Sequence, residues 1–115
     1  PPRSTLFPYT TLFRSMGYSV SEAPNGRVAL EQQISNPADV VITDLIMPEE
    51  NGLETILELQ RLDPDLKIIA MTGSGHIGAL EDLKTASFLG AHRTLFKPFQ
   101  MEDLLRTVEE LLRAP

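Results

Sequence analysis

The sequence predicts an α/β protein with a parallel sheet and helices on both faces of that sheet. Apolar runs typical of strands alternate along the chain with segments in which apolar residues recur at helical spacing. The order is β-α-β-α-β-α-β-α with short connections, a pattern that favours right-handed crossovers between parallel strands. At 115 residues and 42% hydrophobic content, the chain is long enough for one small domain with a single core.

Four segments are expected to form strands. Residues 18–22, YSVSE, alternate apolar and polar side chains, which is typical of a short edge strand. Residues 40–42 are a β-branched run and residues 67–71 a second apolar run, as in strands that are buried on both faces. Residues 93–96 supply the last short strand of the predicted sheet.

Four helices are expected between and after these strands. Apolar residues at helical spacing place them over residues 28–34, 53–59, 80–89 and 101–112. Proline ends the first two, at Asn36-Pro37 and Asp63-Pro64, and Gly90 is a C-cap for the third. Each of the first three helices is therefore followed by a residue that stops it.

Composition excludes several classes of function. The net charge is −6, which argues against direct nucleic-acid binding, because phosphate contacts need clustered Lys and Arg. The chain has no Cys, so disulfides and thiolate metal sites are excluded. No apolar run approaches the ~20 residues that span a membrane, and residues 1–15 lack the apolar core of a signal peptide.

Polar residues follow three consecutive strands at the point where each strand ends. They are Asp44 after VVIT, Thr72 after KIIAM and Lys97 after RTLF. Because ligands bind at the carboxyl ends of parallel strands, this carboxylate, hydroxyl and ammonium are expected at one site. Pro98 follows the lysine, and a cis Lys97-Pro98 bond would turn the Lys97 side chain toward Asp44.

Three motifs resemble the receiver domain of two-component response regulators. They are VVITDLIMPEENGLE, IIAMTG and GAHRTLFKPF, which have the order and spacing of that family over residues 16–115. The resemblance implies a flavodoxin-like fold with a five-stranded parallel sheet in the order 2-1-3-4-5. It also implies a cytoplasmic phosphoprotein that acts in signal transduction and is not an enzyme.

The resemblance also implies a role for each site residue. Asp44 would accept a phosphoryl group from a sensor histidine kinase or a histidine phosphotransfer protein in a phosphorelay. Lys97 would pair with the phosphoryl oxygens, and Thr72 would hydrogen-bond the phosphoryl group as the switch. Asp44 and the backbone carbonyl of Ile46 would be ligands of Mg²⁺.

The sequence departs from the family pattern at two places. Thr94 stands where the family often has an aromatic residue, which puts the usual coupling between Thr72 and that aromatic residue in doubt. Residues 16–26, MGYSVSEAPNG, resemble the end of the first helix and the second strand. Strand one, most of helix one and the acidic pair that completes the Mg²⁺ site therefore have no counterpart, so we expect weak Mg²⁺ binding and impaired phosphorylation.

Residues 1–15, PPRSTLFPYTTLFRS, contain no carboxylate and do not replace the acidic pair. A DNA sequence that resembles a standard sequencing-library adapter translates into this segment. We therefore expect residues 1–15 to be a non-native, adapter-derived segment and residues 16–115 to be an incomplete receiver domain. Leu12, Phe13 and Met16 could still form a helical turn that covers part of the core.

Three other functions compete with the phosphoacceptor. A pseudo-receiver that binds proteins without phosphorylation is the main alternative, although Asp44, Thr72 and Lys97 argue against it. A flavin or nucleotide site at TGSG is disfavoured because such a loop would follow the first strand. A haloacid-type phosphatase is disfavoured because its D-x-D motif reads Asp-Leu-Ile here, without the general acid.

Overall fold

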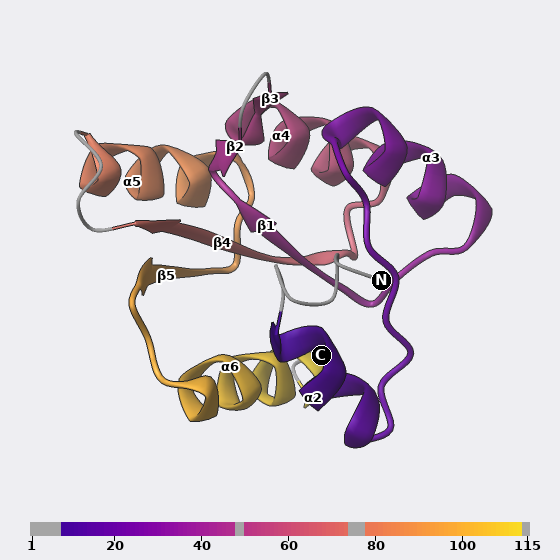
Figure 1. Cartoon of the computed structure of the whole chain (residues 1–115). Coiled ribbons are helices and arrows are strands. Elements are labelled where there is room, and N and C mark those ends of the chain that lie inside the picture. Colours follow the sequence, from indigo (N-terminus) through magenta and orange to yellow (C-terminus); the bar gives the residue numbers. More distant parts are fainter. Residues whose placement is uncertain (1–7, 48–49, 74–77, 114–115) are drawn as a thin grey trace.

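A three-stranded parallel sheet lies at the centre of the molecule (Figure 1). The computed structural model describes residues 8–47, 50–73 and 78–113. The sheet has the order β1-β4-β5, with strands β1 (Val40–Asp44), β4 (Lys67–Gly73) and β5 (Arg93–Lys97). The α/β parallel-sheet class predicted from the sequence is confirmed, with fewer strands than the five that the resemblance implied.

Helices cover both faces of this sheet. One face carries α3 (Gly26–Ser35), α4 (Gly52–Leu62) and α5 (Ala79–Leu89), and the other carries α2 (Pro8–Ser15) and α6 (Met101–Arg113) (Figure 1). A small antiparallel pair, β2 (Ile46–Met47) and β3 (Glu50–Asn51), connects β1 to α4 and was not predicted. No helix in the described ranges is long and apolar enough to cross a membrane.

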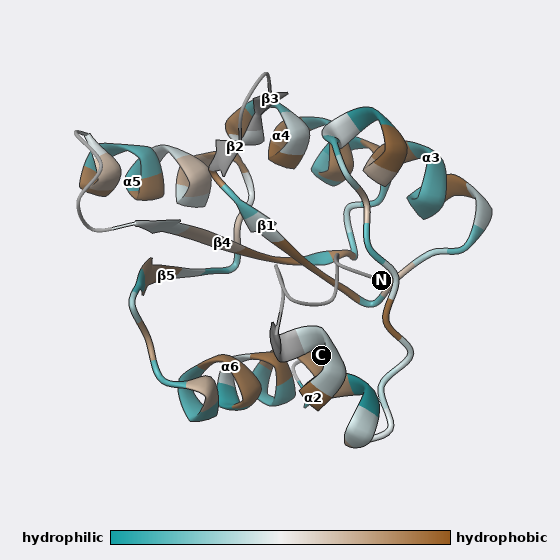
Figure 2. Cartoon of the chain, in the orientation of Figure 1, coloured by the Kyte–Doolittle hydropathy of each residue, from teal (hydrophilic) through white to brown (hydrophobic). Residues whose placement is uncertain are grey.

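The core has two apolar layers, one on each face of the sheet. Apolar residues colour β1, β4 and the inner sides of the helices in Figure 2. The layer beneath α4 is made by Ile56 and Leu59 of α4 with Ile68 and Ala70 of β4, all 0% exposed. Alternate residues of β4 thus face opposite layers, as the period of a strand requires.

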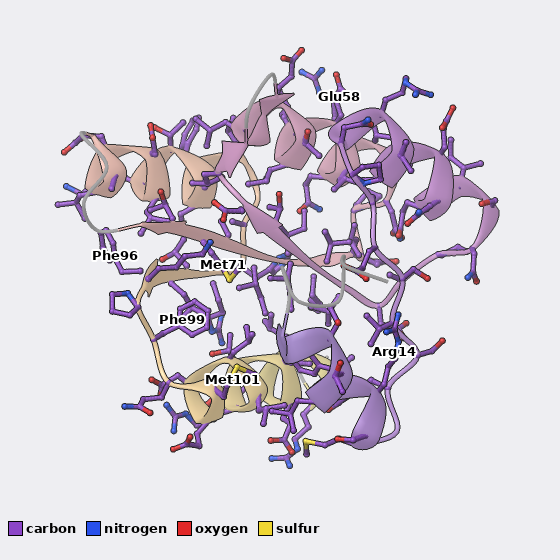
Figure 3. All side chains as sticks on the ribbon, in the orientation of Figure 1. Arg14, Glu58, Met71, Phe96, Phe99 and Met101 are labelled. Carbon is purple, nitrogen blue, oxygen red and sulfur yellow. The ribbon has the colours of Figure 1, made fainter. Side chains whose placement is uncertain are left out.

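The opposite layer lies between the sheet and α6. Met71 of β4, Phe99 and Met101 face one another there (Figure 3). Leu104, Val108 and Leu111 of α6 recur at helical spacing and are buried in the same cluster. Packing against this apolar stripe accounts for the position of α6.

The strand predicted at residues 18–22 is absent from the structure. Tyr18 and Val20 do turn toward the core layer of α6, as their alternation predicted. Their backbone makes no ladder to a neighbouring strand in the described residues. The Tyr18 amide donates to the Phe13 carbonyl over 3.1 Å, Arg14 Nη2 donates to the Val20 carbonyl over 3.2 Å, and Gln32 Nε2 donates to the Glu22 carbonyl over 3.0 Å. The prediction was wrong because a strand needs a neighbouring strand, and none in the described part of the chain pairs with this segment.

Helix α2 packs against the core, although residues 1–15 were expected to be a non-native segment. Phe13 is only 6% exposed and belongs to the core layer of α6. Its ring meets that of Tyr18 edge to face, with centroids 5.7 Å apart. The expected helical turn is therefore present at Leu12 and Phe13, as part of a helix that begins earlier, at Pro8. Met16 lies beyond the end of α2 and is 51% exposed, so its expected part in covering the core was wrong.

Replacing Phe13 with Ala tests whether α2 is docked. We expect Phe13→Ala to lower the free energy of unfolding by about 3 kcal/mol, because it removes a buried aromatic side chain. Met16→Ala is the matched control: Met16 is 51% exposed, and its loss should cost less than about 1 kcal/mol. Urea unfolding measures both values, and equal values for the two variants would mean that α2 contributes nothing to stability.

Candidate functional site

The carboxyl ends of the three parallel strands form one edge of the sheet. Asp44 is the last residue of β1, Lys97 the last of β5, and Thr72 the last but one of β4. The register pairs Asp44 with Met71 and Gly73 with Lys97, so the three strands end at nearly the same level. The structure thus brings together the three residues that the sequence analysis selected.

Asp44 and Lys97 form a direct ion pair across the end of β4. Lys97 Nζ donates to Asp44 Oδ2. Since β4 lies between β1 and β5, the lysine must span about two strand spacings, roughly 10 Å. Gly73, the register partner of Lys97, has no side chain, and this keeps the end of β4 open between the two charges.

The ion pair remains accessible from solvent. The Asp44 side chain is 24% exposed and that of Lys97 41% exposed. The Lys97-Pro98 peptide bond is cis, and Phe99 packs in the core layer of α6 directly after it. The carboxylate is therefore positioned beside a fixed cation but is still open to a reacting group from outside.

Thr72 is fully buried, at 0% exposure, beside this pair. Its Oγ1 atom has no hydrogen-bond partner among the residues that the structure describes. A buried hydroxyl without a partner is uncommon in proteins and carries a free-energy cost. The Thr72 hydroxyl is thus free to bond a group that arrives at the sheet edge.

Gly52 shapes the segment that leaves the site. The Leu45 amide donates to the Met71 carbonyl over 2.8 Å, which continues the β1–β4 ladder past Asp44. A Cβ atom at position 52 would lie 2.9 Å from Leu45 Cα and 3.1 Å from the Asp44 carbonyl oxygen. Glycine is needed here because the start of α4 approaches the backbone of Asp44 closely, and that approach is visible only in the folded structure.

The described residues do not form a complete metal site. No group of three or more His, Cys, Asp or Glu residues in residues 8–47, 50–73 and 78–113 is arranged to hold an ion. Asp44 already has Lys97 as a cationic partner, and the backbone carbonyl of Ile46, the other ligand that the resemblance implied, would add an oxygen without a charge. This donor set does not fit tight binding of a divalent cation, which prefers several oxygen ligands.

Thr94 lies on β5 and is exposed. It occupies the position where the receiver family often has an aromatic residue. Its register partner is Ala70, whereas Thr72 pairs with Phe96. Phe96 is thus the aromatic residue of β5 that lies next to Thr72 in the register, and it is 39% exposed. The sequence pattern did not single out Phe96, because it stands one position before the lysine.

Comparison with known proteins agrees with this fold. The family model described as the response regulator receiver domain matches residues 4–109 of the chain. The chain therefore belongs to the response regulator receiver family, a signalling module of two-component systems rather than a catalytic enzyme.

Individual relatives and structures support the same assignment. Over 98 residues the chain is 34% identical to the response regulator receiver protein CpdR of Brucella abortus (strain 2308), covering 85% of this chain and 79% of CpdR. It is 35% identical over 101 residues to the sensor kinase CckA of the same organism, covering 86% of this chain but 10% of CckA. A response regulator receiver domain protein from Clostridium thermocellum superposes with a TM-score of 0.81 at 28% identity, covering 95% and 86% of the two chains.

Gly52→Ala tests the close approach of α4 to Asp44. We expect it to lower the free energy of unfolding by about 1–3 kcal/mol and to shift the amide resonances of Asp44 and Leu45, because the new methyl group overlaps their backbone. Gly73→Ala is the control, since a Cβ there meets no atom within 4 Å and should change stability by about 0.5 kcal/mol or less. Equal unfolding midpoints for the two variants in urea would contradict this account of Gly52.

Proposed function

We propose that this receiver domain accepts a phosphoryl group on Asp44 from a histidine kinase or a histidine phosphotransfer protein. One oxygen of the Asp44 carboxylate attacks phosphorus, a P–O bond forms, and the P–N bond of the phosphohistidine breaks. The imidazole leaves with the electron pair of that bond. The observation that carries the proposal is the solvent-accessible Asp44 carboxylate held beside Lys97 at the sheet edge.

Lys97 and Thr72 supply the other two parts of this mechanism. Phosphoryl transfer depends mainly on positioning and on neutralising the negative charge of the phosphoryl oxygens. Lys97 would leave the Asp44 carboxylate and pair with those oxygens. The positive charge of Lys97 would then still have a negatively charged partner. The Thr72 hydroxyl would donate to one of them, and this new bond would relieve its unpartnered state and signal the modification through β4.

We further propose that phosphorylation is inefficient in this chain. Mg²⁺, which receiver domains typically bind, neutralises charge on the phosphoryl oxygens when it is present. Here Asp44 and the Ile46 carbonyl would be its protein ligands, and no group of three or more His, Cys, Asp or Glu residues in the described part of the chain could hold the ion. Lys97 would then balance most of the developing charge, so the reaction should be slow and should need high Mg²⁺ concentrations.

Labelling with acetyl phosphate tests this proposal. The chain is incubated with acetyl phosphate over a series of Mg²⁺ concentrations, and mass spectrometry of the intact protein counts the attached phosphoryl groups. We expect slow labelling that rises with Mg²⁺ without saturating in the low millimolar range. Asp44→Asn should abolish it, and Lys97→Gln should reduce it by about tenfold or more, the usual effect of losing one preorganised charge contact.

The outcomes separate the alternatives. Complete labelling at low Mg²⁺ would overturn the impairment but would support Asp44 as the acceptor. No labelling at any Mg²⁺ concentration would favour the second candidate, a pseudo-receiver that binds partners without phosphorylation. That candidate is favoured by one observation, the lack of a metal-binding cluster among the described residues.

The origin of residues 1–15 is a separate proposal. We propose that this segment derives from adapter DNA and that the receiver domain proper occupies residues 16–115, in the cytoplasm where its kinase would act. The burial of Phe13 means that the segment nevertheless stabilises the fold. Sequencing the genomic DNA upstream of the Met16 codon tests this: the adapter sequence should be absent there, and its presence in the genome would refute the proposal.

A further inference from the structure

His92 makes two hydrogen bonds to the same residue at the beginning of β5. Its backbone amide donates to the Ile68 carbonyl over 2.7 Å. Its ring atom Nδ1 accepts from the Ile68 amide over 3.1 Å. The ring thus supplies an acceptor at the point where the β4–β5 ladder has not yet begun, since β5 starts at Arg93.

This arrangement requires the neutral form of the imidazole. Nδ1 accepts a hydrogen bond from the Ile68 amide, so in the neutral ring the hydrogen is on Nε2. Protonation at Nδ1 would turn the acceptor into a donor that faces another donor. Ile68 is 0% exposed, so its amide would then be left without a partner in the core.

The surroundings of the ring also oppose a positive charge. Burial lowers the pKa of His92 below its ordinary value of 6.5, and the positive charges of Lys67 and Arg93 lower it further. Lys67 belongs to β4 and Arg93 to β5, and Arg93 Nη1 donates to the His92 carbonyl over 2.8 Å. The neighbouring helices bring uncharged groups to this connection: Gln60 of α4 lies against Gly90, and the Ala86 carbonyl of α5 accepts from the Ala91 amide.

We propose that His92 is a pH-sensitive latch that fastens the beginning of β5 to β4 when the ring is neutral and releases it when the ring is protonated. The latch acts at the beginning of β5, the strand that carries Lys97 at its other end. It operates independently of whether Asp44 is phosphorylated. The sequence analysis did not select His92, because a single histidine before a strand has no recognisable pattern.

The direction of the pH effect follows from the two states of the protein. In the unfolded chain His92 takes up a proton near pH 6.5, whereas the folded chain resists it. The stability from the latch is therefore complete above about pH 6.5 and is lost as the pH falls below that value. If the folded ring stays neutral, the unfolding equilibrium constant rises by up to about tenfold between pH 7.5 and pH 5.5 from this group alone.

One variant and one control variant test the latch. His92→Asn keeps an acceptor near the position of Nδ1 but does not titrate, so it should lose the pH-dependent component and remain folded at pH 5.5. His76→Asn removes the other histidine of the chain and should keep the pH dependence of the unmodified protein. Urea unfolding at pH 7.5 and 5.5 gives the unfolding constants, and the comparison between variants cancels the shared contribution of the carboxylates.

Hydrogen exchange in the unmodified protein gives a second readout that needs no variant. After correction for the intrinsic pH dependence of exchange, protection of the Ile68 and His92 amides should fall between pH 7.5 and 5.5. Protection of the Leu45 amide, which bonds Met71 on the other side of β4, should stay unchanged. An equal pH effect in His92→Asn and the unmodified protein, or unchanged protection of Ile68, would overturn the proposal.

Discussion

The parallel register of β1, β4 and β5 is the constraint on which the rest of the structure depends. It aligns Asp44 with Met71 and Gly73 with Lys97, so residues far apart in the sequence end at one edge. Because β4 lies in the middle and is buried on both faces, it holds the two charged strands at a set distance. A shift of one residue would exchange the core and helix-facing sides of a strand and move its terminal side chain away from the site.

The two core layers depend on this same central strand. Ile68 and Ala70 face the helices α4 and α5, while Ile69 and Met71 face α6. The second layer also includes Phe13 of α2 and the extended residues Tyr18 and Val20. The sheet is narrower than the fold of the family leads one to expect, and the N-terminal residues cover apolar surface without adding a strand.

The site combines a reactive carboxylate with one cation and one unpartnered hydroxyl. Asp44 and Lys97 balance each other in charge, and Thr72 supplies a hydrogen bond that nothing in the described residues uses. The proposed phosphoryl transfer rests on this set, and no group of three or more His, Cys, Asp or Glu residues in the described ranges could hold a divalent cation beside it. At the opposite end of β5 the ring of His92 accepts a hydrogen bond from the Ile68 amide, and this second bond to Ile68 requires the neutral ring.

The sequence by itself determined the order of the elements from α3 to α6, apart from the β2–β3 pair, together with the class of the fold and the three residues at the strand ends. Local patterns suffice for these, since apolar periodicity, proline and glycine act over a few residues and parallel strands end at a common edge. Only the tertiary structure showed that residues 18–22 do not form a strand and that Phe13 is buried in the core. It also showed why position 52 requires glycine and that the His92 ring accepts a hydrogen bond from Ile68. Each of these depends on which residue lies beside it in space: a strand without a neighbour does not pair, and a ring accepts a hydrogen bond only where a distant amide meets it.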